Sequence, residues 1–139
     1  MSTTAQPGTA GSLMTDDPIV VPIDMPLSEA AAVMDFYRVS ALPIVDWTGC
    51  LVGVISQTDL LHARTTDALW HAWPGLTVRY LMTHPAITVT ADTPLDEAAE
   101  LMESRRIHRL VVVAQDGETP IGVLSVTDLV HSMAERGDT

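Results

Sequence analysis

The chain has 139 residues, of which 47% are hydrophobic, and its formal net charge is −11. This length and composition suit one ordinary domain or two small ones with a buried core, and they exclude a disordered chain. Because non-specific binding to phosphate backbones depends on positive charge, the acidic balance also argues against DNA and RNA as partners.

The chain begins with residues 1–8, which are small and polar and lack the basic and apolar regions of a signal peptide, so we expect a flexible tail. The longest apolar runs, such as 110–114, are far shorter than a membrane span. The single cysteine, Cys50, excludes an internal disulfide and a cysteine-based zinc site, and it fits a reducing compartment. We therefore expect a cytoplasmic protein without membrane association.

Two copies of one unit make up most of the sequence. Shifted by about 68 residues, the chain aligns with itself over roughly 50 positions with a single one-residue insertion. The matched strings include Leu13-Met14-Thr15 with Leu81-Met82-Thr83, Glu29-Ala30-Ala31 with Glu97-Ala98-Ala99, and Thr58-Asp59-Leu60 with Thr127-Asp128-Leu129. We predict a first repeat at 9–64, a linker at 65–76, a second repeat at 77–134 and a tail at 135–139.

Each repeat is expected to open with a short helical turn, capped by the hydroxyl of Thr9 or Thr77. A longer helix follows, and in the second copy its apolar residues recur at 95, 98, 99 and 102, the pattern of one buried face. Thr93 and Pro94 suit its cap and first turn. The first copy has Met25 in place of Thr93, so we expect a weaker cap there.

The strands of the unit are predicted from β-branched and apolar runs separated by turn residues. They are expected at 19–21, 42–45 and 51–55 in the first copy and at 87–89, 110–113 and 120–124 in the second, with turns at 47–49 and Asp116-Gly117 and a final helix leaving Ser56 or Ser125. The order is β-α-β-β-α after a helical lead-in. In the linker, 66–73 extends the preceding helix or forms a short one that Pro74-Gly75 ends. There, Trp70 and Trp73 either pack over the core edge or anchor a subunit interface.

Each copy closes with the pattern Gly-h-h-Ser-x-x-Asp (h, apolar), from Gly53 to Asp59 and from Gly122 to Asp128. With the element order and the duplication, this pattern resembles the CBS domain, and the tandem pair resembles a Bateman module. The strings 107–113 and 39–43 are also similar to repeats of the γ subunit of AMP-activated protein kinase. The resemblance implies an α+β fold in which the two repeats pack sheet against sheet about a pseudo-two-fold axis and leave two clefts.

The resemblance further implies that each cleft takes the loop before the second strand from one repeat and the Ser-x-x-Asp turn from the other. One site would then contain Ile19, Val39, Ser40, Ala41, Leu42 and Pro43 with Ser125 and Asp128. The other would contain Ile87, Ile107, His108, Arg109 and Leu110 with Ser56 and Asp59.

The chemistry of these residues suits an adenine nucleotide. A carboxylate can accept hydrogen bonds from both ribose hydroxyls, a serine at a helix start can bind a hydroxyl or phosphate, and His108 and Arg109 offer donors to phosphate. The first repeat has Ser40-Ala41 instead of the His-Arg pair, so its cleft suits less charged adenosyl ligands such as S-adenosylmethionine, or no ligand. Two bland alternatives stay open: Ser-x-x-Asp is also a capping box that needs no ligand, and the arginines at 105, 106 and 109 can form a solvated face.

We therefore expect a regulatory module that binds AMP, ADP or ATP, with or without Mg²⁺, and signals to an effector protein that the sequence does not name. No obligatory cofactor, metal site or catalysis is expected, because the histidines lack metal-ligand spacing, Cys50 lacks a nearby histidine and no glycine-rich phosphate loop is present. We expect a homodimer that buries helical surface near Met34, Met102 and Met133. The competing hypotheses are a structural or partner-binding protein without a ligand and a small nucleotide-processing enzyme.

Overall fold

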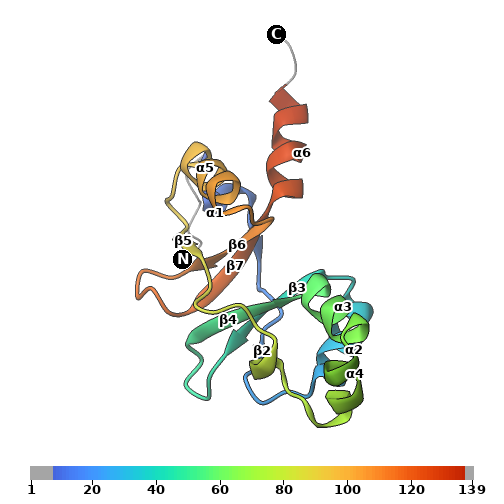
Figure 1. The fold of residues 1–139 in the computed structure, drawn as a ribbon. Coiled ribbons are helices and arrows are strands. Elements are labelled where there is room, and N and C mark those ends of the chain that lie inside the picture. Colours follow the sequence, from blue (N-terminus) through green and yellow to red (C-terminus); the bar gives the residue numbers. More distant parts are fainter. Residues whose placement is uncertain (1–7, 137–139) are drawn as a thin grey trace. The chain divides into compact units, whose positions relative to one another are not determined.

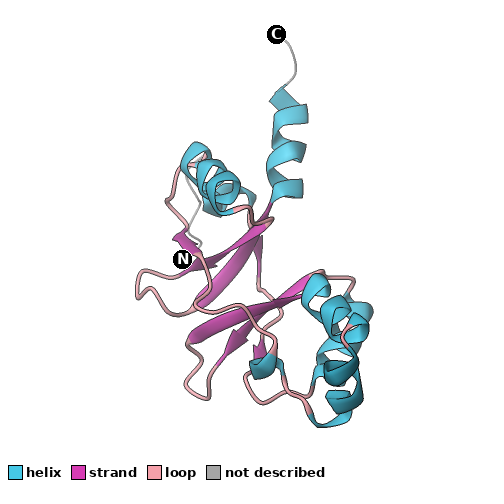
Figure 2. Cartoon of the chain, in the orientation of Figure 1, coloured by secondary structure: helices cyan, strands magenta, loops and turns pink. Residues whose placement is uncertain are grey.

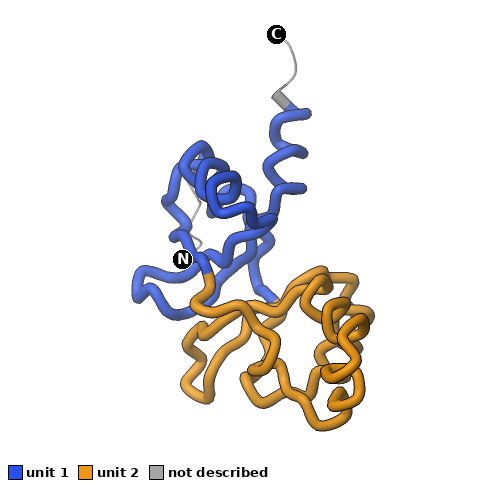
Figure 3. Tube along the Cα trace, viewed as in Figure 1, with its two compact units in different colours: residues 1–18, 87–139 blue, residues 19–86 orange. Residues whose placement is uncertain are grey.

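The computed structural model describes residues 8–136. The chain divides into two compact units, shown in Figure 3. Unit 1 joins the residues up to Pro18 with those from Ile87 onward, and unit 2 is the continuous segment Ile19–Ala86. Each unit combines helices with its own sheet (Figure 2), so the predicted α+β class is confirmed.

Unit 2 is built on a three-stranded sheet in the order β2-β3-β4. Strand β3 (Ala41–Val45) runs parallel to β2 (Val21–Pro22) and antiparallel to β4 (Leu51–Ser56). The helical segments of this unit are α2 (Leu27–Tyr37), α3 (Gln57–Thr65), α4 (Asp67–Ala72), η1 (Trp73–Gly75) and η2 (Val78–Tyr80). Its core contains the fully buried side chains of Leu27, Leu42, Ile44, Ile55 and Val78.

Unit 1 has a four-stranded sheet in the order β1-β7-β6-β5. Its strands are β1 (Thr15–Asp16), β5 (Thr88–Thr90), β6 (Arg109–Val113) and β7 (Pro120–Ser125), and its helices are α1 (Ala10–Leu13), α5 (Leu95–Arg105) and α6 (Val126–Arg136), all labelled or traceable in Figure 1. The core contains Ala10, Ala98, Leu110, Val112 and Leu124, none of which is exposed.

The two sequence repeats exchange their lead-in segments. In unit 1 the N–H of Leu95 donates to the Gly8 carbonyl at 3.0 Å and the N–H of Ala10 donates to the Thr93 carbonyl at 2.8 Å. In unit 2 the equivalent bonds run from Leu27 to Leu76 and from Val78 to Met25, both at 2.9 Å. The lead-in of each sequence repeat therefore packs in the compact unit that holds the rest of the other repeat. The repeat boundaries remain a prediction about the sequence and do not coincide with the compact units.

Two glycines allow these lead-ins to lie flat on the sheets. A Cβ at Gly53 would meet the Thr83 carbonyl oxygen at 2.8 Å and the Met82 sulfur at 2.9 Å. A Cβ at Gly122 would collide with the Met14 sulfur and come within 3.0 Å of the Thr15 carbonyl oxygen. The glycine that opens each Gly-h-h-Ser-x-x-Asp pattern is thus required by close packing, because no side chain fits beneath the lead-in.

Most predicted elements are confirmed, and the differences lie at their ends. The first strand of each repeat starts one or two residues later than predicted, at Val21 and Thr88. The predicted cap at Thr93 is wrong: Pro94 precedes the helix, and the Thr93 hydroxyl instead accepts a 3.1 Å hydrogen bond from the N–H of Thr90. Both long helices follow a proline and have no side-chain cap bond, and the first N–H of each donates instead to a backbone carbonyl, that of Leu76 for α2 and that of Gly8 for α5.

The linker and the lead-ins also differ in detail from the sequence prediction. Strand β1 was not predicted; it pairs antiparallel with β7. The lead-in at Thr77 is a 3₁₀ turn without a side-chain cap bond. Helix α4 is separate from α3, and Trp73 packs against the core of unit 2, whereas Trp70 is 43% exposed. The predicted tail at 1–8 lies outside the described residues except for Gly8, and α6 continues into the predicted tail at 135–139 as far as Arg136.

Candidate functional site

The Ser-x-x-Asp turn of each unit forms the capping box that its sequence predicts. In unit 2 the N–H of Ser56 donates to Asp59 Oδ2 at 2.8 Å, its hydroxyl donates to the same oxygen at 3.0 Å, and the N–H of Asp59 donates back to Ser56 Oγ at 3.2 Å. Ser125 and Asp128 make the same three bonds at the same distances. Within residues 8–136, no hydrogen bond reaches Oδ1 of either aspartate, so each carboxylate keeps one oxygen for a further donor.

A second segment lies beside each of these turns. Helices α2 and α5 end at Arg38 and Arg106, which adopt left-handed backbone angles with φ of 58° and 55°. The chain then reverses into β3 or β6. The Ser40 carbonyl accepts a 2.9 Å bond from the N–H of Gln57, and the His108 carbonyl accepts a 2.9 Å bond from the N–H of Val126. Each pre-strand loop is therefore fixed against the Ser-x-x-Asp turn of its own repeat.

The exposed groups differ between the two loops. Unit 1 presents His108, which is exposed, and Arg109, which is half-buried and pairs with Ser125 in the sheet register. Unit 2 presents Ser40 and Ala41 at the equivalent places, with Ala41 opposite Ser56. The unit 1 loop therefore carries an imidazole and a guanidinium at the two positions where the unit 2 loop carries a hydroxyl and a methyl group.

Several predicted site residues belong to the cores. The side chains of Leu42 and Leu110 have no exposed surface, and Pro43 is also buried. The half-buried residues Ile19 and Val39 pack against the core of unit 2, and Ile87 and Ile107 pack against the core of unit 1. A ligand beside Leu42 or Leu110 would therefore contact backbone atoms rather than these side chains. The predicted pairing of each loop with the other repeat's Ser-x-x-Asp turn stays a prediction.

Each hairpin turn contains an aspartate that accepts hydrogen bonds within the turn and is not among the predicted site residues. Hydrogen bonds from the Thr48 hydroxyl and from the N–H groups of Cys50 and Thr48 lower the pKa of Asp46. The Thr119 hydroxyl, followed by the N–H groups of Glu118 and Thr119, lowers the pKa of Asp116 in the same way. Both carboxylates are therefore ionised at neutral pH and act as acceptors in the turns.

Each unit also has a groove between its two long helices, which the sequence analysis did not predict. In unit 1 a groove of about 400 Å³ lies between α5 and α6, and in unit 2 a groove of about 360 Å³ lies between α2 and α3. The grooves occupy equivalent places in the two repeats. The signal in the sequence was the recurrence of apolar residues at 126, 129, 130 and 133, which marks one apolar face of a helix.

Between residues 8 and 136, no cluster of three or more histidine, cysteine, aspartate or glutamate side chains could hold a metal ion. None of the helices in this range has the length and apolar character needed to cross a bilayer.

Comparison with known proteins identifies the family. The CBS domain profile matches residues 10–65 and 78–135, and the chain therefore belongs to the CBS domain family. The solved structure of CBSX2 in complex with AMP is similar to it, with a TM-score of 0.79 and 30% identity, over 92% of this chain and 97% of that one. So is the CBS domain pair of MJ0100 in complex with 5′-methylthioadenosine and S-adenosyl-L-methionine, with a TM-score of 0.84 and 25% identity, over 96% of this chain and all of that one.

Among curated proteins, the inosine-5′-monophosphate dehydrogenase of Methanocaldococcus jannaschii is 31% identical over 123 residues. These residues make up 87% of this chain but only 23% of the dehydrogenase. The chain thus spans about a quarter of the length of the first curated relatives that it matches. The likeness covers only this share of the dehydrogenases, so their activity is not carried over to this chain.

Proposed function

We propose that this CBS pair is a regulatory module that binds adenosine-containing ligands and passes their occupancy to an effector protein. The observation that carries the proposal is the duplicated arrangement of a Ser-x-x-Asp turn held against a pre-strand loop, with one open carboxylate oxygen in each copy. Such an oxygen can accept from a ribose hydroxyl while Oδ2 maintains the helix cap. Two similar CBS pairs are solved with AMP and with methylthioadenosine and S-adenosylmethionine, which supports this ligand class.

We further propose different preferences for the two sites. One site takes AMP, ADP or ATP, because His108 and Arg109 can donate to phosphate. It consists of Ile87, Ile107, His108, Arg109 and Leu110 together with Ser56 and Asp59. The other site takes a less charged adenosyl ligand such as S-adenosylmethionine. It consists of Ile19, Val39, Ser40, Ala41, Leu42 and Pro43 together with Ser125 and Asp128. The protein acts as a homodimer without catalysis of its own.

Isothermal titration with AMP, ATP and S-adenosylmethionine tests this proposal. Arg109→Ala should weaken AMP and ATP binding by roughly 10- to 100-fold, the loss typical of a charge-assisted hydrogen bond, and should leave S-adenosylmethionine binding nearly unchanged. Arg105→Ala is the matched control, because it removes the same charge from an exposed position in the same segment. If none of the three ligands gives a heat of binding, the proposal is wrong and the Ser-x-x-Asp turns act only as helix caps.

The pairing of residues is tested by Asp59→Asn, which keeps a side-chain oxygen that can accept from the N–H of Ser56 but removes the carboxylate charge. It should weaken the site that contains Arg109 and spare the other. Equal loss at both sites would refute the assignment. Incubation of ATP and AMP with the protein, followed by chromatography, should recover both unchanged; a conversion product would favour the enzyme hypothesis.

A further inference from the structure

In each unit a backbone hydrogen bond joins the pre-strand loop to the helix that follows the last strand. In unit 1 the N–H of Val126, the first residue of α6, donates to the His108 carbonyl at 2.9 Å. In unit 2 the N–H of Gln57, the first residue of α3, donates to the Ser40 carbonyl at 2.9 Å. Because the first N–H groups of a helix have no acceptor within the helix, each loop carbonyl satisfies a donor that the fold would otherwise leave open.

The sheet register holds the same loop and turn together a second time. Arg109, the first residue of β6, lies opposite Ser125, the last residue of β7. Ala41 of β3 lies opposite Ser56 of β4 in the same way. Residues that face each other across antiparallel strands are close neighbours. In each unit, therefore, a residue of the loop and the serine that caps the next helix cannot move independently.

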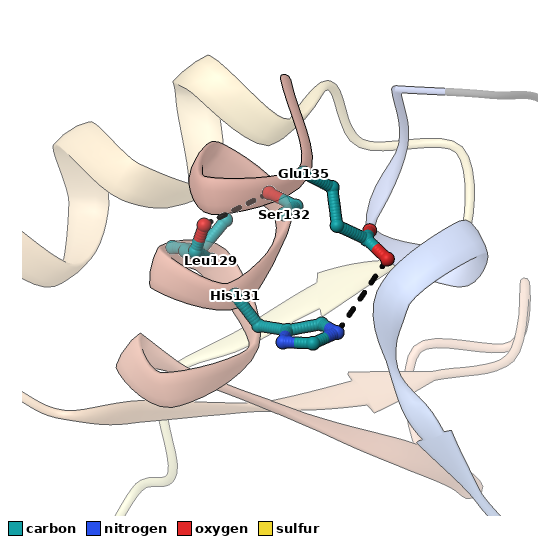
Figure 4. A network of polar contacts seen from close by, with 4 residues as sticks. All are labelled: Leu129, His131, Ser132 and Glu135. Atoms are coloured by element: carbon teal, nitrogen blue, oxygen red, sulfur yellow. Dashed lines mark hydrogen bonds and ion pairs between the residues drawn. The ribbon is translucent and has the colours of Figure 1, made fainter. Parts of the chain in front are cut away.

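Polar contacts further along α6 stay within the helix. Figure 4 shows His131 and Glu135, with 3.6 Å between His131 Nε2 and a carboxylate oxygen of Glu135. It also shows the Ser132 hydroxyl, which donates to the Leu129 carbonyl at 2.8 Å. Both contacts join residues about one turn apart, so they support the helix without connecting it to the loop. The connection to the loop lies at the start of α6, at Val126, directly after the serine of the capping box.

These bonds gain a further meaning from the pairing of residues proposed above. In that pairing the loop with His108 and Arg109 belongs to one ligand site, whereas the turn with Ser125 belongs to the other. The Val126 bond then runs from the loop of the first site to the turn of the second, and the Gln57 bond runs from the loop of the second site to the turn of the first. A ligand that orders one loop also orders the turn that the other ligand needs, so the second ligand loses less conformational freedom when it binds.

We propose that the N–H groups of Val126 and Gln57 couple the two adenosyl sites, so that each ligand raises the affinity of the protein for the other. Val126 and Gln57 are positioning residues, because they act through the backbone of the loop and the turn and neither side chain belongs to a site. The inference rests on the proposed function and its pairing of residues, and it adds that each site regulates the other.

Isothermal titrations with AMP and S-adenosylmethionine, each alone and each with the other ligand at saturation, measure the coupling. In the wild-type protein AMP should bind about fivefold or more tightly once S-adenosylmethionine is bound, which is the lower end of ordinary coupling between sites. S-adenosylmethionine should gain affinity by the same factor when AMP is bound, because coupling between two binding sites is reciprocal.

Proline substitutions isolate the two hydrogen bonds. Gln57→Pro and Val126→Pro remove the donating N–H, and proline suits the first residue of a helix because its φ is already helical. Ser56, which precedes Gln57, has extended backbone angles of −119° and 166°, and a following proline favours such angles. Each proline variant should lower the coupling factor, and the double variant Q57P/V126P should abolish it. The matched controls Gln57→Ala and Val126→Ala keep the N–H and should keep the coupling.

Amide hydrogen exchange of the wild-type protein is a second measurement, which does not depend on the folding of the proline variants. AMP alone should slow exchange at the N–H of Val126, and S-adenosylmethionine alone should slow exchange at the N–H of Gln57, because each ligand holds the loop whose carbonyl accepts from that donor. Circular dichroism checks that the proline variants are folded.

The outcomes separate this inference from the proposed function. If both ligands bind the wild-type protein without coupling, if both folded proline variants keep the full coupling, or if exchange at both amides is unchanged, the coupling is wrong and the proposed function stands. If neither ligand binds, the proposed function is wrong and the coupling is wrong with it.

Discussion

The two units differ most where nothing in the fold requires them to agree. They share the exchanged lead-in, the glycine beneath it, and a capping box with identical bond lengths. They differ in the pre-strand loop, His108-Arg109 against Ser40-Ala41, and in the outer face of the last helix, where Met133 stands opposite Arg64 in the alignment. Both units therefore keep the residues that their packing and helix caps require, while exposed side chains beside these features have diverged. The difference between the two loops is the one on which the proposed ligand preferences depend.

The largest effect is expected at the glycines under the lead-ins. Gly53→Ala should destabilise the protein by about 1–3 kcal/mol, because the new Cβ meets a backbone carbonyl that cannot rotate away. Gly122→Ala should cost less, because its two closest contacts are with the flexible Met14 side chain and the nearest backbone oxygen, of Thr15, is 3.0 Å away instead of 2.8 Å. Urea unfolding of both variants measures the difference. Gly75→Ala is the control, since a Cβ there has no atom within 4 Å, and an equal loss in this variant would contradict the packing argument.

A smaller and equal effect is expected at the two caps. Ser56→Ala and Ser125→Ala each remove the hydroxyl that accepts from the N–H of the aspartate three residues later, so each should cost about 1 kcal/mol in the free energy of unfolding. Ser28→Ala, in the first turn of α2 and exposed, serves as the control and should be nearly neutral. Clearly unequal losses at Ser56 and Ser125 would show that the two turns are not energetically equivalent.

The smallest effect concerns the hairpin aspartates. Hydrogen bonds hold the pKa of Asp46 and of Asp116 below the ordinary value of 3.8 in the folded protein. Each turn therefore contributes stability above the ordinary pKa and loses it as the pH falls through the lowered pKa. Thr48→Val, which removes the largest cause at Asp46, should raise the pKa of Asp46 and leave that of Asp116 unchanged. Carboxyl chemical shifts followed through an acid titration measure both values, and a shift at both residues would contradict the local origin.

The sequence predicted the fold well because duplication and helix periodicity are local patterns. The predicted cap at Thr93 was wrong because helix-capping patterns consider only residues that are neighbours in the sequence. The carbonyl that accepts from the first N–H of α5 belongs to Gly8, which is far away in the sequence. Strand β1 was missed for the same reason, since two residues carry no periodicity and the strand exists through pairing with β7.

Only some features of the candidate site follow from the sequence. The capping turns and the contrast between His108 and Ser40 follow from residue types alone. The full burial of Leu42 and Leu110 does not, because apolar residues at a strand start can face either a core or a ligand. The unit 1 groove could have been found from the stripe at 126–133, but the exposure of that stripe depends on what packs against it.

The exchange of lead-ins also orders the events of synthesis. Unit 2 is one continuous stretch of chain, so it can be completed while the second repeat is still being made. The segment with α1 and β1 is made before unit 2, but its described hydrogen bonds run to α5, to the turn before α5 and to β7, which are all made after unit 2. The α1–β1 segment therefore reaches its native contacts after unit 2 is complete, and a ribosome stalled before β7 would carry one finished unit and an unpaired β1 strand.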